Sequence, residues 1–170
     1  MGILLVQLAL AAGARVIGAA RTRQKLDVVR ELGANVVVDY AEPGWLEQVR
    51  AATDGAGPTV VFDGVGGTIG RAAFDMTARG GQFSAYGAPS GGFAAIEPHD
   101  AEQRGVVLRG IARVQFAPVD ARRLTQRALS EAAAGRMRLV IGQTFPLERA
   151  VDAHTAIEAR RAIGKTLLLI

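Results

Sequence analysis

The chain has 170 residues, of which 49% are hydrophobic and 21% charged, as in a globular protein with a sizeable core and not in a disordered chain. It contains no cysteine, which excludes disulfides and thiolate metal ligands, and only two histidines, so no zinc or other metal site is expected within it. The net charge of +4 comes mainly from arginines scattered among acids, which argues against nucleic-acid binding and suits a phosphorylated small molecule.

The first predicted element is a helix over Gly2–Ala12, which leads into a strand over Val16–Ala20. No basic residue precedes its apolar run and no cleavage site follows it, so we expect neither a signal peptide nor a membrane span, and a cytoplasmic location. Gly2 takes the place of the last glycine of a G-x-G-x-x-G turn, which sets a helix N-terminus against a pyrophosphate. The strand and the glycines that would come before it are not in this sequence.

Two further rounds of helix and strand follow, over Gln24–Leu32 and Val36–Tyr40 and then over Trp45–Thr53 and Thr59–Asp63. This alternation favours a parallel sheet. The strands are short, continuous and β-branched, which is typical of central strands with helices on both faces. A glycine after each of the first two helices, Gly13 and Gly33, predicts a left-handed helix end.

The remaining sheet elements are predicted as a helix over Thr68–Ala78, a strand over 82–87, a loop rich in glycine and proline, and a strand over 106–111. The sheet-containing part is expected to end near Val114. From Pro118 the pattern changes to helices over Asp120–Ala134 and Leu147–Arg160 and strands over 139–145 and 165–170. We therefore expect a dinucleotide-binding domain over residues 1–117 and a separate C-terminal segment over 118–170.

Basic residues stand where a dinucleotide-binding unit selects its adenosine ribose. A unit selective for NAD usually has an acid at the end of its second strand, about 20 residues after the glycine turn. Here that place holds Arg21, and Arg23 and Lys25 follow within one helical turn. These cations could surround a ribose 2′-phosphate, which favours NADP(H) over NAD(H). The alternative is a solvated basic helix start.

Two glycine-rich segments follow neighbouring strands at the edge where α/β sheets bind ligands. The first comprises Asp63, Gly64, Val65 and Gly66, whose small residues would let a nicotinamide ribose approach the backbone; the alternative is a tight strand-to-helix turn. In the second, Gly87 and Ser90 are the candidates. We find no nucleophile–base–acid arrangement and assign no catalytic residue. His154 is expected to be a packed or surface side chain.

The segments GARVIGAARTRQKLDVVRELGANVVVDY, TVVFDGVGG, GGQFSAYGAPSGG and PLERAVDAHTAIEARRAIGKTLLLI resemble quinone oxidoreductases of the medium-chain dehydrogenase/reductase superfamily. The resemblance covers essentially the whole chain and implies a Rossmann-like, doubly wound parallel sheet that corresponds to the C-terminal half of such an enzyme. It implies that Lys25 and Tyr40 contact the 2′-phosphate and that Arg160 reaches the cofactor's phosphates. It also implies that residues 118–170 pack on an N-terminal substrate domain, and that Val106–Ile111 forms a homodimer edge.

The same resemblance implies an NADP(H)-dependent, zinc-independent oxidoreductase that transfers hydride to a quinone or an activated alkene. In such an enzyme the cofactor carries the reactive chemistry, so the lack of an acid–base pair is no objection. Two alternatives stay open: a noncatalytic nucleotide-binding or interaction module, and a subunit of a split reductase. A start codon assigned inside a longer gene is a third explanation of the short N-terminus.

The strand expected before Gly2 would lie in the middle of a sheet with the order 3-2-1-4-5-6. Without it, the strands that begin near Val16 and Thr59 would keep unpaired edges, which favour association. The chain could be a fragment, a neighbouring chain could donate the strand, or residues 1–10 could leave the helix and fill the gap. Without the glycine turn we expect weak cofactor binding and little turnover from this chain alone.

Overall fold

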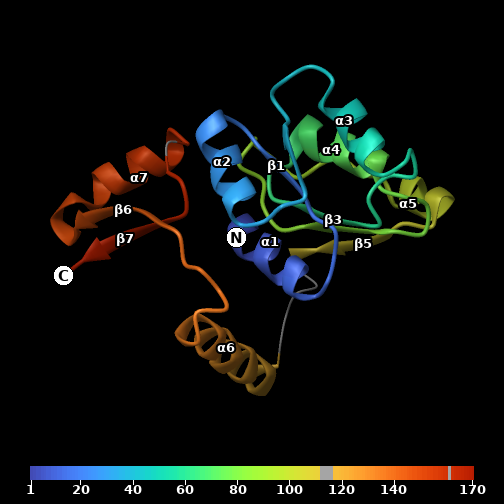
Figure 1. The fold of residues 1–170 in the computed structure, drawn as a ribbon. Coiled ribbons are helices and arrows are strands. Elements are labelled where there is room, and N and C mark those ends of the chain that lie inside the picture. Colours follow the sequence, from blue (N-terminus) through green and yellow to red (C-terminus); the bar gives the residue numbers. More distant parts are fainter. Residues whose placement is uncertain (112–116, 161) are drawn as a thin grey trace.

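The computed structural model describes residues 1–111, 117–160 and 162–170. Helices and strands alternate along most of the chain (Figure 1). The helices are α1 (Gly2–Ala11), α2 (Arg23–Glu31), α3 (Trp45–Ala52), α4 (Gly67–Met76), α5 (Pro98–Arg104), α6 (Pro118–Ala133), the 3-10 helix η2 (Leu147–Arg149) and α7 (Ala150–Glu158). The strands are β1 (Ile17–Ala20), β2 (Val36–Asp39), β3 (Val60–Asp63), β4 (Gln82–Ala85), β5 (Val107–Gly110), β6 (Ile141–Pro146) and β7 (Lys165–Leu169). The predicted end of the sheet-containing part near Val114 lies outside the described residues.

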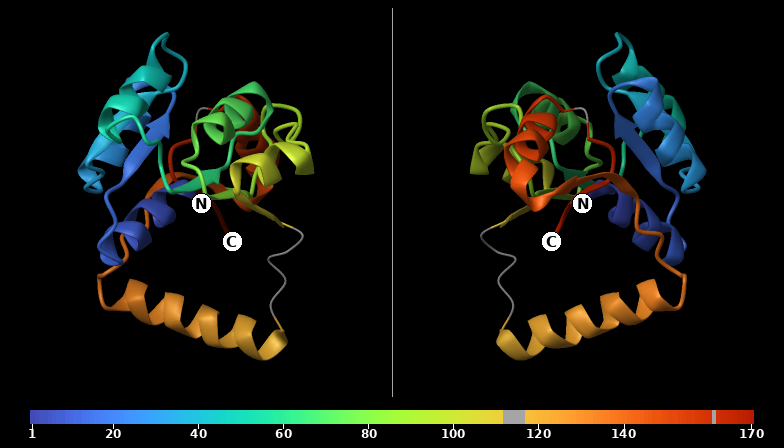
Figure 2. Two further views of the ribbon diagram at one scale, coloured as in Figure 1. Left: turned by 90° about the vertical axis from the view of Figure 1, so that its right-hand side faces the viewer. Right: turned by 90° about the vertical axis from the view of Figure 1, so that its left-hand side faces the viewer.

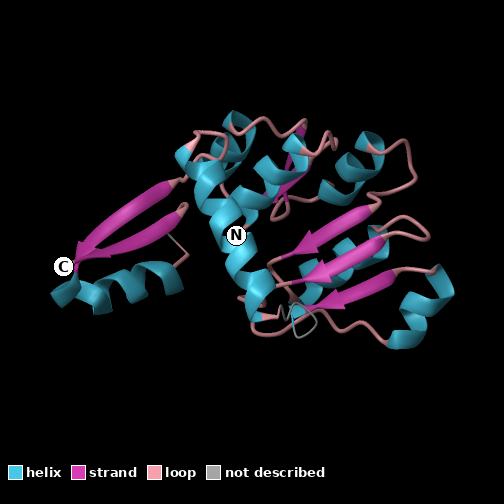
Figure 3. Cartoon of the chain, turned by 90° about the horizontal axis from the view of Figure 1, so that it is seen from below, coloured by secondary structure: helices cyan, strands magenta, loops and turns pink. Residues whose placement is uncertain are grey.

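The strands pair in parallel and form separate sheets. β1 pairs with β2, β3, β4 and β5 are neighbours in that order, and β6 pairs with β7. Figure 3 shows β3, β4 and β5 side by side, with β6, β7 and α7 at the other end of the molecule. The arrangement is a Rossmann-like α/β fold, and among the described residues no strand lies between β1 and β3.

The expectation that the first three strands are central is wrong for β1, β2 and β3, because each has a paired neighbour on one side only. In β3 the apolar side chains of Val60 and Phe62 remain 48% and 49% exposed. The alternative in which residues 1–10 fill the gap as a strand is wrong for this structure, because Gly2–Ala11 is helical. Leucine and alanine favour a helix, whose backbone hydrogen bonds are satisfied within the segment.

Helix ends follow the predicted glycine signals. Gly13 and Gly33 have φ of 77° and 95°, so both adopt the left-handed region. Helix α5 was not predicted, because it lies within the glycine- and proline-rich loop. Its signals are nevertheless regular: Pro98 occupies the first turn together with Asp100, and Gly105 ends the helix with φ of 64°.

The core consists of two clusters that meet at α4. Phe74 from α4 and Phe83 from β4 are fully buried, with ring centroids 5.7 Å apart in an edge-to-face arrangement. On the other side, Met76 from α4 packs with Val38 and Val49. Because α4 contributes to both clusters, it joins the three-stranded sheet to the β1–β2 sheet.

Arg104 fixes α5 against the end of α4. Its guanidinium donates hydrogen bonds to the carbonyl oxygens of Phe74, at 2.8 Å, and of Thr77. The same group lies 5.2 Å from the centroid of the Phe74 ring. A cation at the carboxyl end of a helix satisfies terminal carbonyls and interacts favourably with the helix dipole.

The C-terminal segment touches the rest of the chain at few places. Helix α6 stands apart from the other helices (Figures 1 and 2) and contains no buried residue. Ahead of β6, the backbone of Arg138 exchanges two hydrogen bonds with the side-chain amide of Gln7 on α1. The predicted division at residue 117 stays a prediction. Within the described residues, no helix combines the length and apolar character that crossing a membrane requires.

The buried aromatic pair should dominate the stability of the three-stranded sheet. We expect Phe83→Ala to lower the free energy of unfolding by about 3–5 kcal/mol, because it removes a buried ring and leaves a cavity. The matched control is Phe93→Ala, whose side chain is 52% exposed and which should cost less than about 1.5 kcal/mol. Urea unfolding followed by circular dichroism measures both, and equal losses would contradict this description of the core.

Candidate functional site

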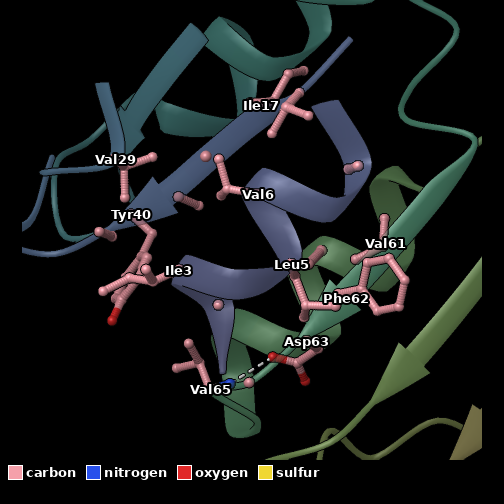
Figure 4. A pocket seen from close by; sticks show the side chains of 18 of the residues that line it. Ile3, Leu5, Val6, Ile17, Val29, Tyr40, Val61, Phe62, Asp63 and Val65 are labelled. Atoms are coloured by element: carbon pink, nitrogen blue, oxygen red, sulfur yellow. Dashed lines mark hydrogen bonds between the residues drawn. The ribbon is translucent and has the colours of Figure 1, made fainter. Parts of the chain in front are cut away.

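A cleft of about 1150 Å³ separates the β1–β2 sheet from the three-stranded sheet. Its walls come from α1, from β1 and from β3, and Figure 4 shows Ile3, Ile17 and Val61 lining it. The carboxyl ends of β1 and β3 both open into it. This is the edge at which parallel α/β sheets bind ligands.

Three predicted residues, Arg21, Lys25 and Tyr40, line one end of the cleft, and the predicted Arg160 lies beside them, where its guanidinium donates to the carbonyl oxygen of Pro89. Arg21 directly follows β1, Tyr40 directly follows β2, and Lys25 lies in the first turn of α2. The ammonium of Lys25 donates a hydrogen bond to the backbone carbonyl oxygen of Arg160, at 2.7 Å. The end of α7 is thereby placed beside residues more than a hundred positions earlier in the chain.

This group of residues carries an excess of positive charge. The pKa of Lys25 is lowered, first by burial and then by the charges of Arg21 and Arg160. The pKa of Tyr40 is raised by burial, although the charges of Arg21 and Arg160 oppose that shift. Mutual repulsion of this kind is relieved by an anion, and a phosphate supplies acceptors for both guanidinium and ammonium groups.

Asp39 organises the backbone next to these cations and was not among the predicted residues. Its carboxylate accepts hydrogen bonds from the N–H of Thr22, at 3.2 Å, and from the N–H of Ala41, at 2.9 Å. Thr22 adopts a positive φ of 75°, which is uncommon for a threonine. The sequence does offer one clue to this role of Asp39: it is an acid at the end of a β-branched strand, which is a common place for an Asx turn.

Asp63 shapes the loop that follows β3. Asp63 is 5% exposed, and its carboxylate accepts hydrogen bonds from the N–H of Val65, at 2.8 Å (Figure 4), and from the N–H of Gly66, at 3.0 Å. The buried carboxylate therefore holds the loop backbone and does not face the cleft as a free acid. Two hydrogen bonds from backbone N–H groups satisfy a buried charge that would otherwise be costly.

The loops after β3 and β4 are tied together at the same edge. The hydroxyl of Ser90 donates to the carbonyl oxygen of Val65, at 2.8 Å, and the N–H of Gly67 donates to the carbonyl of Gly92, at 3.0 Å. Gly87 packs against Gly64, where an added Cβ would come within 2.9 Å of a backbone oxygen. The predicted Gly87 and Ser90 thus have structural partners in the first loop.

Tyr86 fills the space between these loops and α1. Its ring lies where a Cβ on Gly64 would clash, at 2.5–2.7 Å, and its hydroxyl lies 3.6 Å from a Cβ built on Gly2. Gly2, Gly64 and Tyr86 therefore surround one point at the N-terminus of α1. Burial, together with the charge of Asp63, raises the pKa of Tyr86 and keeps the phenol neutral. In the sequence, Tyr86 lies near the end of the strand predicted over 82–87, whereas in the structure it directly follows β4.

The histidines do not join this site. His99 lies on α5, with Nε2 at 3.0 Å from the side-chain nitrogen of Gln103. His154 lies on α7 and is exposed. Among residues 1–111, 117–160 and 162–170, no group of three or more histidine, cysteine, aspartate or glutamate side chains could hold a metal ion.

Several proteins that resemble this chain in sequence and fold are oxidoreductases. The chain is 28% identical to a quinone oxidoreductase of Sus scrofa over 171 residues, which cover 100% of this chain and 51% of that protein. Among solved structures, an Escherichia coli quinone oxidoreductase complexed with NADPH has a TM-score of 0.90 and 26% identity over 99% of this chain and 53% of that one. An NAD-dependent alcohol dehydrogenase has a TM-score of 0.86 and 31% identity over 99% and 47%.

The chain spans about half the length of the relatives that it matches. The family model described as "Zinc-binding dehydrogenase" matches residues 1–131, which include most of the residues that line the cleft, both glycine-rich loops and the cations that follow β1. On this match, the chain belongs to the zinc-binding dehydrogenase family.

Proposed function

We propose that this chain binds NADP(H) and forms the cofactor-binding portion of an oxidoreductase that transfers hydride to a quinone or an activated alkene. The observation that carries the proposal is the convergence of Arg21, Lys25 and Arg160 beside Tyr40, at the carboxyl ends of β1 and β2. The similarity to a quinone oxidoreductase complexed with NADPH supports the same cofactor.

The cations fit a ribose 2′-phosphate better than a ribose with free hydroxyls. Burial and then the charges of Arg21 and Arg160 lower the pKa of Lys25, and a phosphate monoester, which carries a charge of about −1.5 to −2 at neutral pH, would offset the charge repulsion. Arg21 stands where a unit selective for NAD has an acid, and the nearby Asp39 is engaged by two backbone N–H groups. Arginine offers planar paired donors and lysine a point charge.

The glycine-rich loops would hold the other end of the dinucleotide. Gly64 and Gly66 let the neighbouring Tyr86 and Gly92 pack closely against the loop backbone, which Asp63 and Ser90 fix in place. Gly2, at the N-terminus of α1, lies on the side where a pyrophosphate would gain from free N–H groups. When bound, NADP(H) supplies the hydride, while these residues bind and orient it.

The reaction and substrate are proposed from the resemblance to quinone oxidoreductases. The family's name refers to zinc, but the side chains in the described part of this chain do not fit a zinc site, and no step is assigned to a metal. We retain the proposal of a homodimer through β5. That strand is the last of its sheet, and Val107 at its start is 48% exposed.

The preference for NADPH over NADH directly tests the cation group formed by Arg21, Lys25 and Arg160. We expect calorimetric titration to show tighter binding of NADPH than of NADH. The double variant R21A/K25A should bind NADPH at least about tenfold more weakly, because each of the two substitutions removes a charge-assisted hydrogen bond to the phosphate. Binding of NADH should change by less than about threefold, because it has no 2′-phosphate.

The matched control is R122A/R123A on α6, which removes the same net charge from exposed positions away from the cleft. It should leave both affinities unchanged within about threefold. Equal affinity for NADPH and NADH, or an equal loss in both double variants, would show that the cation group does not select the phosphate.

The loop after β3 should depend on the carboxylate of Asp63. We expect Asp63→Ala to lower the free energy of unfolding by about 1–3 kcal/mol and to speed hydrogen exchange at the amides of Val65 and Gly66, which lose their acceptor. Asp27→Ala, which removes an exposed ion pair with Arg30 on α2, is the control and should cost less than about 1 kcal/mol. Unchanged exchange at Val65 and Gly66 would overturn this role.

A further inference from the structure

The hydroxyl of Tyr86 is a polar group of the cleft to which the proposed function gives no role. Tyr86 directly follows β4, and it is one of the residues that line the cleft. Its N–H donates to the carbonyl oxygen of Asp63, at 2.8 Å, and the tip of its ring packs over Gly64, where an added Cβ would lie 2.5 Å from the hydroxyl oxygen. The backbone and the ring are both held in place, so the hydroxyl has a defined position.

This hydroxyl keeps a proton that it can donate to a ligand. Burial, and then the charge of Asp63, raise the pKa of Tyr86, so the phenol is neutral at physiological pH. Between the described residues, no side-chain hydrogen bond involves the hydroxyl, whereas every fully buried polar side-chain atom among them has a partner. The hydroxyl is therefore accessible from the cleft, where a phenol can act as a hydrogen-bond donor.

The hydroxyl lies beside the first turn of α1, at 3.6 Å from a Cβ built on Gly2. The N–H groups of Leu4 and Leu5 donate to the carbonyl oxygen of Met1, so the helix is formed from its first residue. The N–H groups ahead of these bonds have no acceptor within a helix, and together with the helix dipole they favour an anion. A phenol donor beside them adds to the same preference.

The first turn of α1 falls between the two ends of the proposed dinucleotide site. In Figure 4 this turn, marked by Ile3, lies between Tyr40, which belongs to the cation end, and Val65, in the loop after β3. A dinucleotide with its 2′-phosphate at the cation group and its nicotinamide ribose at the glycine-rich loops places its pyrophosphate at the N-terminus of α1. The pyrophosphate therefore passes beside the hydroxyl of Tyr86.

We infer that Tyr86 is a cofactor-binding residue whose hydroxyl donates a hydrogen bond to a pyrophosphate oxygen of the bound dinucleotide. The inference rests on the proposed function, to which it adds a residue outside the cation group. NADPH and NADH carry the same pyrophosphate, so Tyr86 strengthens the binding of both, whereas Arg21 and Lys25 strengthen the binding of NADPH alone. Affinity for the dinucleotide and selectivity for its phosphate thus depend on different residues.

The two tyrosines of the chain provide a matched pair of variants, Tyr86→Phe and Tyr40→Phe, each of which removes a single oxygen atom. The full chain is titrated calorimetrically with NADPH and with NADH. We expect Tyr86→Phe to bind both nucleotides about tenfold more weakly, because each loses a hydrogen bond to a charged oxygen. Tyr40→Phe, which acts at the cation end, should weaken the binding of NADPH and leave that of NADH unchanged within about threefold.

Phosphorus NMR of the saturated complexes locates the lost hydrogen bond, because the pyrophosphate and the 2′-phosphate of NADPH give separate signals. In Tyr86→Phe the pyrophosphate signals of bound NADPH should shift while the 2′-phosphate signal stays, and Tyr40→Phe should show the reverse. A purely structural role of Tyr86 would not produce this difference. The urea midpoint of Tyr86→Phe should match that of the unsubstituted chain, since the ring remains and only its hydroxyl is removed.

The possible failures are distinguishable. Equal affinities in Tyr86→Phe and the unsubstituted chain, a loss confined to NADPH, or an unmoved pyrophosphate signal would overturn the role of Tyr86 and leave the proposed function intact. Failure of the unsubstituted chain to bind either nucleotide would overturn the proposed function, and this inference with it.

Discussion

A strand in a parallel sheet directs backbone donors and acceptors toward both of its neighbours, and in this fold β1 and β3 have a neighbour on one side only. The two sheets are therefore held together by side chains and not by a hydrogen-bonded ladder. Helix α4 provides many of these side-chain contacts, because Phe74 packs into the three-stranded sheet while Met76 packs with Val38. The cleft, the exposed Val60 and Phe62, and the small core all follow from this constraint.

The carboxyl edge of the sheets is better organised than their interior. Asp39 joins the segments after β1 and β2, and Asp63 folds the loop after β3 upon itself. Ser90 then links that loop to the next one. Each of these contacts is a short-range polar bond within a loop or between neighbouring loops, so none of them depends on a strand between β1 and β3.

Much of the fold was predictable because its signals are local. β-branched runs marked the strands, and Gly13 and Gly33 marked helix ends. Helix α5 was missed because seven residues are too few for a periodic pattern within a glycine-rich loop. The bond from Lys25 to Arg160 joins positions 135 apart, so spacing could not reveal it, and the resemblance supplied Arg160 instead. The buried state of Asp63 depends on how its loop folds, which the sequence pattern leaves open.

The corner formed by Arg21, Lys25 and Arg160 has an unusual response to dissolved salt. Most charged contacts here, such as Arg30 with Asp27, are exposed pairs of opposite sign, and ions in solution weaken them. In the corner, the charges of Arg21 and Arg160 add to burial in lowering the pKa of Lys25, and these like charges repel one another across the junction between α2 and the end of α7. Screening reduces that repulsion, so rising ionic strength tightens this junction while it loosens the ion pairs elsewhere on the surface.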